Sequence, residues 1–371
     1  MLTILSVIGT RPEAIKLAPV IRALAARKDR VRSLVCVTRQ HHEMLQQMLD
    51  FFGIGVDIDL DIMVSGQSLS SLTSTAVQSL QTVLDSLRPD WVVVQGDTTT
   101  AMTASLVAFY NRAKVAHVEA GLRTLDKHAP FPEEINRRLI STIADLHFAP
   151  TSAARDILIA ERHQPDSIMV SGNTVIDSLF WANQQIRHGK LRPPLALAEL
   201  IAGRRLVLVT AHRRENFDRG MSEICEALRD IADRYEDVVI VYPVHPNPNV
   251  REPAGRMLSG VPRIELMAPL DYGSFAYLLD RAVLILTDSG GIQEEASALG
   301  RPTIILRDVT ERPEVLASGN AVLAGTRRDS ILKSVDRILS NPSVQSAMSV
   351  PSAVFGKGDA GELIARRLIS V

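Results

Sequence analysis

Short runs of β-branched and other apolar residues recur along this chain, and each run is followed by a stretch whose apolar residues have helical spacing. Runs that are apolar throughout are typical of strands covered on both faces, as in parallel sheets. Their alternation with helices predicts an α/β architecture with right-handed crossovers. The runs occupy residues 3–8, 31–37, 91–94, 115–118, 146–148, 206–209, 238–241, 263–266, 283–286 and 303–306.

Two sheets accommodate these runs better than one, because a single sheet with so many strands would be unusually wide. The length of 371 residues also exceeds the size at which one core stops growing. We expect the boundary between residues 171 and 204, where a helical pattern is followed by a Pro-Pro break and a polar segment. Amphipathic helices are predicted at residues 69–87, 221–235 and 272–280, and a further helix at 358–371.

Composition argues against several classes of protein. A formal net charge of -1, without a run of Lys and Arg, disfavours a nucleic-acid binder. The two cysteines, Cys36 and Cys225, have neither zinc-ligand nor disulfide-framework spacing, which favours a reducing compartment. The start lacks a signal-peptide pattern, and no apolar run reaches the roughly 20 residues of a membrane span. We therefore expect a cytoplasmic protein without a membrane segment.

The segment GTRPEAIK follows the first predicted strand, at the edge where open α/β sheets bind ligands. Gly9 is expected to form the turn, Pro12 suits the first helical turn, and Lys16 follows one turn later. Arg11 could offer a bidentate fork to a pyrophosphate; alternatively, it forms a surface pair with Glu13. Neither a G-x-G-x-x-G fingerprint nor a P-loop is present, so we expect no NAD-linked or ATP-hydrolysing activity and no cofactor.

The segment TDSGGIQEE places Ser289, Gly290 and Gly291 between a buried strand and a helix. Two glycines allow the backbone to approach a ligand closely, and the N–H groups and dipole of a helix N-terminus favour a phosphate. Glu294 and Glu295, in the first turns of that helix, could reach a ribose diol. The alternative is a tight turn in which the serine caps the helix and the glutamates satisfy its dipole.

Three carboxylates follow strands of the first half, namely Asp97, Glu119 and Glu133. Asp97 could instead cap the next helix, which is the commoner use of such an aspartate. Glu119 precedes no helical run directly, so a capping role is harder to assign to it. Glu133 begins a helix, and its neighbour Glu134 is expected to face solvent. Three acids at one sheet edge suggest proton transfer, because like-charge repulsion can keep one of them protonated near neutral pH.

Histidines follow two predicted strands of the second half. His212 lies beside Arg213 and is suited to stabilise an anionic leaving group, and His245 occupies the corresponding place after the next strand. Structural histidines and solvated loop arginines are the alternatives. No histidine pair has the H-x-x-x-H or H-E-x-x-H spacing of a zinc site, so we expect no metal.

Nine polar segments together carry a resemblance to one family. They are GTRPEAIK, QHHEML, GDTTT, HVEAGLRT, PEEINRR, AHRREN, PVHPNPNVREP, LTDSGGIQEEA and RDVTERPE. In order and spacing, through essentially the whole chain, they resemble the non-hydrolysing UDP-N-acetylglucosamine (UDP-GlcNAc) 2-epimerases.

The resemblance implies a GT-B-like fold of two Rossmann-like domains facing a central cleft. With the boundary expected above, these domains are residues 1–171 and 172–357. The resemblance implies that the second domain binds UDP and that the C-terminal helix 358–371 packs back on the first. It implies reversible conversion of UDP-GlcNAc to UDP-N-acetylmannosamine (UDP-ManNAc) by elimination and re-addition of UDP, for bacterial surface polysaccharides. It also implies a homodimer and, in some members, a second UDP-GlcNAc that activates the enzyme.

The resemblance also implies roles for residues at matching positions. The diphosphate would be held by Arg11, His212, Ser289, Gly290, Gly291 and Arg312, and the ribose by Glu295. The catalytic group would comprise Asp97, Glu119, Glu133, His212 and Lys16, in which the three acids transfer protons. The surroundings of the activator match Gln40, His41, Glu43, Arg213 and His245. Residues 62–67, with the sequence IMVSGQ, stand where some members carry an arginine, so activation by substrate is left open.

Three alternative functions are compatible with the sequence. A GT-B glycosyltransferase would share the Ser-Gly-Gly segment before a helix, but it would not need the three acids. A hydrolysing epimerase would release free sugar and UDP, and its family departs from the GTRPEAIK and HVEAGLRT strings. A non-catalytic nucleotide-sugar sensor would tolerate loss of the acids, all of which are present.

Overall fold

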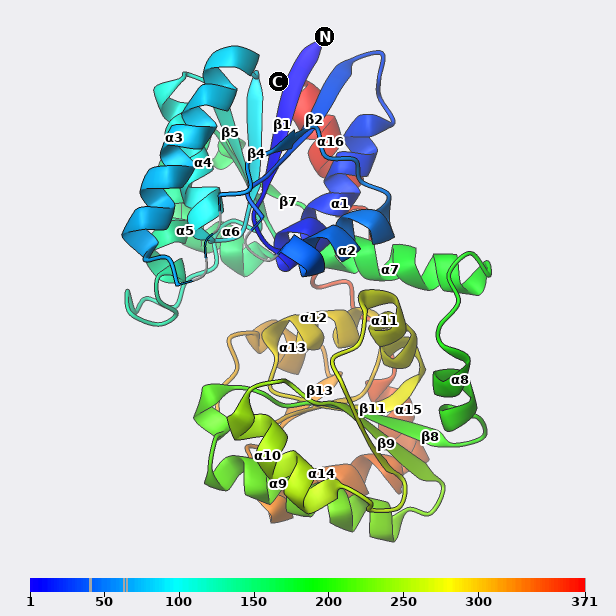
Figure 1. Cartoon of the computed structure of the whole chain (residues 1–371). Helices are drawn as coiled ribbons and strands as arrows, with labels where there is room; N and C mark the ends of the chain where they lie inside the picture. The colour runs from blue at the N-terminus through cyan, green and yellow to red at the C-terminus, as the bar shows by residue number, and fades with distance from the viewer. Residues whose placement is uncertain (40–41, 63, 65, 371) are drawn as a thin grey trace. The chain divides into compact units, whose positions relative to one another are not determined.

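The structure is a computed structural model that describes residues 1–39, 42–62, 64 and 66–370, and it divides into two compact units (Figure 1). The first unit contains Met1–Ser178 and Phe355–Val371, and the second contains Leu179–Val354. Each unit is built on its own parallel sheet with helices on both faces. The predicted α/β architecture with two sheets is therefore confirmed.

The sheet of the first unit has seven parallel strands in the order β3-β2-β1-β4-β5-β6-β7. They are β1 (Leu2–Ile8), β2 (Val31–Val37), β3 (Ile58–Asp59), β4 (Trp91–Gln95), β5 (Lys114–Val118), β6 (Leu146–Ala149) and β7 (Ile168–Val170). The strand order reverses between β1 and β4, so the segments that follow these two strands diverge. Such a switch point leaves a crevice at the carboxyl ends of the strands, where α/β proteins bind ligands.

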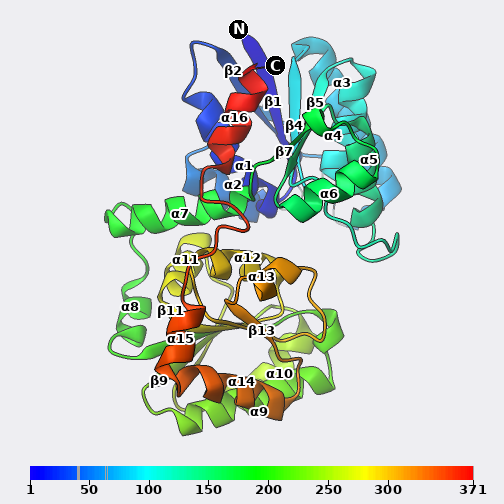
Figure 2. The ribbon, with the colours of Figure 1, turned by 180° about the vertical axis from the view of Figure 1, so that it is seen from behind.

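Helices cover both faces of this sheet. They are α1 (Arg11–Ala25), α2 (His42–Phe52), α3 (Leu69–Leu87), α4 (Thr99–Tyr110), α5 (Glu133–Ile143), α6 (Ser152–Ala160), the start of α7 (Thr174–Arg187) and α16 (Ala360–Ser370). Helices α1, α2 and α16 lie on one face, and α3, α4 and α5 lie on the other (Figure 2). Leu80 of α3 and Val107 of α4 are fully buried with Leu5 and Val92 of the sheet in one core. The sheet edge that carries the polar segments is thus held by packing on both sides.

The sheet of the second unit has six parallel strands in the order β10-β9-β8-β11-β12-β13, and its order reverses between β8 and β11. The strands are β8 (Arg205–Thr210), β9 (Val238–Pro243), β10 (Ile264–Met267), β11 (Ala282–Thr287), β12 (Thr303–Ile305) and β13 (Ala321–Leu323). The helices are α8 (Leu195–Ile201), α9 (Arg219–Arg234), α10 (Pro248–Leu258), α11 (Tyr272–Arg281), α12 (Gly290–Ala298), α13 (Pro313–Ala317), α14 (Arg328–Leu339) and α15 (Pro342–Met348). A core of buried apolar side chains joins the sheet to α9, α10 and α14.

The last helix, α16, is attached to the first unit at two places. Gly361 lies so close to α1 that a Cβ atom on it would come within 2.6 Å of the Cβ of Pro19. The carboxylate of Asp177, in α7, accepts a hydrogen bond of 2.8 Å from the Gly361 N–H. Burial raises the pKa of Asp177 to about 6. Packing and a capping carboxylate together fix the N-terminal end of α16.

The sequence pattern does not predict β3, β7 and β13. Each has only two or three residues and lies at the edge of its sheet. The helices predicted at residues 69–87, 221–235 and 272–280 correspond to α3, α9 and α11. Among the helices of the described residues, none is long and apolar enough to cross a membrane.

Candidate active site

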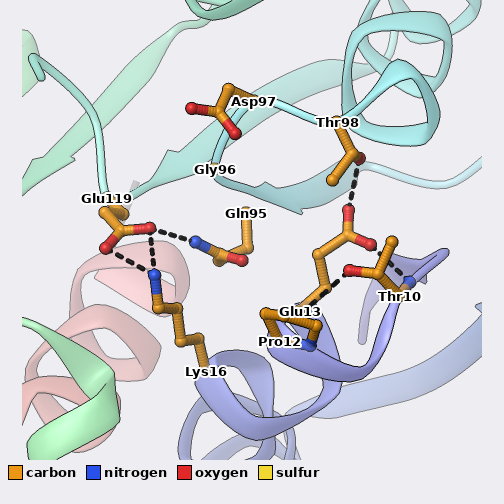
Figure 3. A pocket seen from close by; sticks show the side chains of 9 residues that line it. All are labelled: Thr10, Pro12, Glu13, Lys16, Gln95, Gly96, Asp97, Thr98 and Glu119. Carbon is orange, nitrogen blue, oxygen red and sulfur yellow. Dashed lines mark hydrogen bonds and ion pairs between the residues drawn. The ribbon is translucent and has the colours of Figure 1, made fainter. Parts of the chain in front are cut away.

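A pocket of about 340 Å³ lies at the switch point of the first sheet (Figure 3). The segments that follow β1, β4 and β5 form it. Its lining residues are Thr10, Pro12, Glu13, Lys16, Gln95, Gly96, Asp97, Thr98 and Glu119. The structure therefore brings together Lys16, Asp97 and Glu119, which lie far apart in the sequence.

Glu13 fixes the segment that forms one wall of this pocket. It is buried, and its carboxylate accepts hydrogen bonds from the N–H groups of Gly9 at 2.9 Å and Thr10 at 2.6 Å. It also accepts one from the hydroxyl of Thr98 at 2.6 Å, so it joins the segments after β1 and β4. Burial raises the pKa of Glu13. The alternative of a surface pair between Glu13 and Arg11 is wrong, because Arg11 is exposed and Glu13 is turned inward.

Gly9 is required by close packing. A Cβ atom at this position would lie 2.2 Å from Oγ1 of Thr100 and 2.9 Å from Oγ1 of Thr38. The φ angle of Gly9 is not positive, so this glycine does not serve a left-handed turn. Its small size lets the end of β1 lie against α4.

Glu119 and Lys16 form an ion pair in the pocket. The Nζ of Lys16 lies 2.6 Å from both carboxylate oxygens, and the side-chain amides of Gln95 and Asn173 also donate to this carboxylate. The backbone of Glu119 has a φ of 66°, a left-handed conformation that is uncommon outside glycine and concentrates at functional sites. Donors from α1, β4 and the start of α7 thus hold one carboxylate.

Asp97 does not cap the helix that follows it. Thr98 is the N-cap of α4, and Asp97 instead forms an ion pair with Arg137 of α5. Burial raises the pKa of Asp97; Arg137 partly offsets this rise, and the negative charge of Glu119 adds to it. Opposing influences of this kind suit a carboxyl group that takes up and releases a proton.

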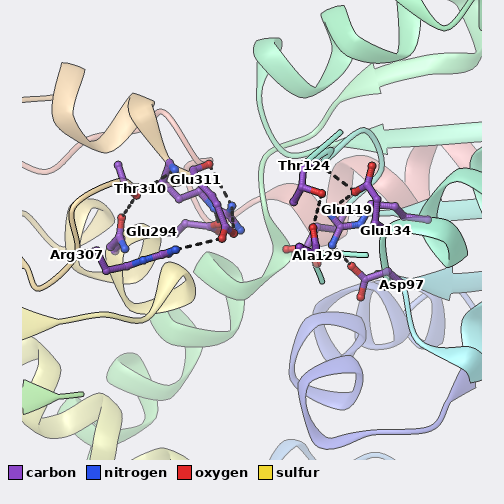
Figure 4. Close-up of polar contacts among 12 residues, drawn as sticks. Asp97, Glu119, Thr124, Ala129, Glu134, Glu294, Arg307, Thr310 and Glu311 are labelled. Carbon is purple, nitrogen blue, oxygen red and sulfur yellow. Dashed lines mark hydrogen bonds and ion pairs between the residues drawn. The ribbon is translucent and has the colours of Figure 1, made fainter. Parts of the chain in front are cut away.

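Glu133 is the first residue of α5, and it is not among the residues that line the pocket. The expectation that Glu134 faces solvent is wrong, because this side chain is fully buried. Its carboxylate accepts a hydrogen bond of 3.0 Å from the Thr124 N–H and pairs with Arg138 at 2.7 Å (Figure 4). Glu134 therefore anchors the segment between β5 and α5.

Asp288 anchors the segment after β8 at the switch point of the second sheet. One of its oxygens accepts hydrogen bonds of 2.8 Å from the N–H groups of His212 and Arg213, and one of 2.9 Å from the Asn216 amide. The other oxygen lies 3.5 Å from Nδ1 of His212. Burial lowers the pKa of His212, and Asp288 opposes this shift. A carboxylate at Nδ1 orients the imidazole and leaves Nε2 for a ligand.

Ser289, Gly290 and Gly291 form the start of α12. Ser289 occupies the N-cap, but its side chain makes no capping hydrogen bond, so the capping alternative is wrong. A Cβ atom on Gly290 would lie 3.9 Å from the Arg312 guanidinium and 4.0 Å from that of Arg213. A Cβ on Gly291 would meet no described atom within 4 Å. Helix N–H groups and two guanidinium groups converge here, an arrangement that suits a phosphate.

Glu294 and Glu295 lie in the second turn of α12 and are buried. Glu294 forms an ion pair with Arg312, which fixes the guanidinium beside the helix start. The hydroxyl of Thr310 donates a hydrogen bond to Gln293, and the guanidinium of Arg307 forms an ion pair with Glu215. The segment before α13 is therefore held at several points (Figure 4). Because neither glutamate lies in the first turn, the alternative in which they satisfy the dipole at the start of the helix is wrong.

The residues matched to an activator site lie in both units. Glu43 is exposed on α2. In the second unit, the His245 ring stacks on His212 with ring centroids 5.4 Å apart and an angle of 15° between the planes. Arg213 lies beside Gly290, at the start of α12. Gln40 and His41 lie outside the described residues.

Four side chains that position the site are not predicted from the sequence. They are Gln95, Arg137, Asn173 and Asp288, and their partners lie 24, 40, 54 and 76 residues away along the chain. Gln95 and Asp288 lie at the carboxyl ends of strands, and Arg137 lies within the polar segment PEEINRR, so the sequence offers a usable signal for each of them. For Asn173, the only signal in the sequence is its position directly before a helix.

Both units are Rossmann-like, and each carries polar side chains at its switch point. The first holds acid groups beside a lysine, and the second holds guanidinium groups at a helix start. Two Rossmann-like units in one chain are the architecture of GT-B-like α/β proteins, and this chain carries a candidate acid/base site in the first of them.

The family model described as UDP-N-acetylglucosamine 2-epimerase matches residues 22–369. The chain belongs to this family. It is 48% identical to the UDP-N-acetylglucosamine 2-epimerase of Yersinia pestis over 98% of both chains. It is similar to the UDP-GlcNAc 2-epimerase of Neisseria meningitidis bound to UDP-GlcNAc, with a TM-score of 0.92, 42% identity and 100% coverage of both chains. The Methanocaldococcus jannaschii enzyme in complex with UDP-GlcNAc and UDP has a TM-score of 0.80 and 33% identity, again over 100% of both chains.

Proposed function

We propose that this chain interconverts UDP-GlcNAc and UDP-ManNAc without net hydrolysis, by eliminating UDP and adding it back. The relatives named above act on or bind UDP-GlcNAc, and the sequence identity extends over nearly the whole chain. The resemblance to the family implies that the product, UDP-ManNAc, supplies N-acetylmannosamine for bacterial surface polysaccharides.

The chemistry explains why acids and an anion site are needed together. The C2 proton is not adjacent to a carbonyl, so enolate formation is unavailable. When the C1–O bond to UDP breaks, positive charge at C1 acidifies C2–H, a carboxylate accepts the proton, and 2-acetamidoglucal and UDP result. The UDP oxygen then bonds to C1 again while a proton is delivered to the opposite face of C2.

The second unit carries groups suited to the departing UDP. From this unit we assign the start of α12 with Arg312 to the diphosphate, His212 to the leaving oxygen, and Glu295 to the ribose. Arg11, which belongs to α1 of the first unit, is also assigned to the diphosphate. Preorganised groups that stabilise developing charge usually contribute more to catalysis than any other single effect. Arg213 lies at the same helix start and is available to the same anion.

The first unit carries the acid/base groups in this proposal. We assign proton transfer to Asp97, Glu119 and Glu133, with Lys16 balancing their charge. A positioned acid or base contributes typically ~10²–10⁴-fold to a rate. The observation that carries the assignment is the pocket in which Asp97 and the Lys16–Glu119 pair lie together at the switch point of a parallel sheet.

A proton NMR time course with UDP-GlcNAc in deuterated water tests the reaction. The proposal expects a second UDP-sugar, with deuterium at C2 of both sugars. Free sugar plus UDP would instead identify a hydrolysing epimerase. An unchanged spectrum would identify a nucleotide-sugar binding protein, and transfer only after an acceptor is added would identify a glycosyltransferase.

Amide substitutions test the acids one at a time. Asp97→Asn, Glu119→Gln and Glu133→Gln should each slow exchange of the C2 proton with solvent. Asp29→Asn changes an exposed acid of the first unit and should leave exchange unchanged. Normal exchange in all three amide variants would refute the assignment.

We also propose a homodimer and a second, activating UDP-GlcNAc. The activator would contact Gln40, His41, Glu43, Arg213 and His245. Sedimentation at several protein concentrations measures the oligomeric state. If UDP-ManNAc alone reacts as fast as UDP-ManNAc with a trace of UDP-GlcNAc, activation by substrate is refuted.

A further inference from the structure

Asn173 occupies the N-cap position of α7 and is 2% exposed. Its Oδ1 accepts a hydrogen bond of 3.1 Å from the Val175 N–H, and its backbone N–H donates one of 2.7 Å to the Phe355 carbonyl. Its side-chain Nδ2 donates a hydrogen bond of 2.9 Å to Oε1 of Glu119. One buried residue therefore contacts the helix that leaves the first unit, the segment that returns to it, and a carboxylate of the pocket.

The backbone around Asn173 is tightly fixed. The chain leaves the first unit within α7 and returns at Phe355, and glycines of the two segments contact each other. A Cβ atom on Gly172 would lie 2.7 Å from the Cα of Gly356, and both residues have positive φ angles of 85° and 117°. Side chains at either position would be strained. The Asn173 side chain consequently projects from a rigid support.

The hydrogen-bond donors to Glu119 differ in how firmly they fix the orientation of its carboxylate. Lys16 contacts both oxygens at 2.6 Å through a flexible side chain, so it balances charge without defining the carboxylate plane. Asn173 is short and held at both ends, and it contacts Oε1, while Gln95 contacts Oε2. The two amides therefore define the orientation of the carboxylate from opposite oxygens.

We propose that Asn173 is a positioning residue that orients the Glu119 carboxylate for proton transfer, from the place where the outgoing and returning segments of the chain meet. This inference rests on the epimerase reaction proposed above. A role confined to capping α7 is the alternative, and it can be separated because Asn, Asp and Ser are N-caps of similar strength.

Two substitutions retain the cap and change the contact with Glu119. Asn173→Ser keeps a capping oxygen but is too short to reach Glu119. Asn173→Asp keeps the length and places a carboxyl group against Glu119, where its protonated form can donate and its ionised form repels. The charged and titratable groups around Asn173 and its partner Glu119 include Lys16, Asp97, His117 and, one turn along α7, Asp177.

The experiment measures kcat and KM for UDP-GlcNAc by NMR from mildly acidic to mildly alkaline pH, together with Tm. We expect a Tm close to that of the wild type in both variants, because the cap is kept. We expect kcat to fall about 10- to 100-fold with a smaller change in KM, since misplacement of a reacting group acts on the chemical step. In Asn173→Asp, kcat relative to the wild type should rise as the pH falls. In Asn173→Ser, this ratio should not vary with pH.

Asn341→Asp is the matched control, because Asn341 is the N-cap of α15 in the second unit. It should leave kcat and its pH profile unchanged. A wild-type kcat in both Asn173 variants, or a ratio for Asn173→Asp that is independent of pH, overturns the positioning role. Loss of the folded state in both variants would assign a structural role and also overturn it. If the wild-type chain does not epimerise UDP-GlcNAc, the proposed function itself fails.

Discussion

Asp288 accepts a hydrogen bond from the backbone N–H of His212 with one oxygen and lies 3.5 Å from the Nδ1 of the same residue with the other. A single buried carboxylate thus sets both the backbone and the ring of this histidine. Burial lowers the pKa of His212, the His245 ring stacked on it and the nearby Arg213 lower it further, and Asp288 raises it. The protonation of His212 therefore depends on neighbours with opposite effects.

Asp288→Asn should shift the titration of His212 to lower pH. The substitution keeps an accepting oxygen but removes the negative charge that favours the imidazolium form. The His212 ring proton shift, followed by NMR against pH, measures the midpoint. Asp271→Asn exchanges the N-cap of α11 for an equivalent cap and should leave the midpoint in place. An unchanged midpoint in Asp288→Asn would show that the ion pair contributes little.

His245→Ala should shift the same titration in the other direction. Removing the stacked ring exposes His212 to water and removes a group that disfavours its charge, and both effects raise its pKa. The measurement is again the His212 midpoint. His188→Ala removes another exposed histidine of the second unit and serves as the control. A midpoint that falls in His245→Ala would contradict the stacked arrangement.

Gly9→Ala should destabilise the first unit, because the new methyl group would lie 2.2 Å from Oγ1 of Thr100. Overpacking of this kind costs about 1–3 kcal/mol. Gly55→Ala is the matched control, since nothing lies within 4 Å of its Cβ and its φ is not positive. It should change the free energy of unfolding by less than about 0.5 kcal/mol. Urea unfolding measures both, and equal stabilities of the two variants would be inconsistent with the packing around Gly9.

Asp177→Asn should change how stability depends on pH. Burial raises the pKa of Asp177 from 3.8 to about 6, so the folded state retains a proton that the unfolded state releases. The contribution of this group to stability is therefore complete below pH 3.8 and is lost as the pH rises through about 6. The asparagine removes that loss while its oxygen can still accept from the Gly361 N–H.

At about pH 7.5 the variant should be more stable than the wild type by about 1–3 kcal/mol, and the difference should shrink towards about pH 5. Urea unfolding across this range measures the trend. Asp29→Asn, at an exposed position of the first unit, should show no such trend. A difference that grows as the pH falls would have the wrong sign for a carboxyl group with a raised pKa.

Most central strands can be predicted from the sequence because each is a continuous apolar run. Val92 to Val94 of β4, for example, are fully buried, so both faces of the strand select apolar residues. The edge strands β3 and β13 have two and three residues, too few for a periodic pattern. Their place in the sheet depends on pairing with a neighbouring strand, which local sequence does not encode.

The sequence predicts which acidic side chains form the candidate site, but it does not predict which residues contact them. Glu119 and Asp97 can be located because they follow strands, whereas Gln95 and Asn173 depend on contacts 24 and 54 residues apart. The expectation of an exposed Glu134 follows from the usual exposure of a charged residue at a helix start. Its burial instead follows from the segment between β5 and α5, whose Thr124 N–H needs an acceptor.

The second unit is inserted into the first, since Phe355–Val371 completes a body that begins at Met1. During synthesis on the ribosome, every residue of Leu179–Val354 is available before the helix that covers α1 has been made. A nascent chain can thus fold the second unit while the first unit still exposes Pro19 and the apolar face around it. Completion of the first unit requires that Phe355–Val371 has also emerged.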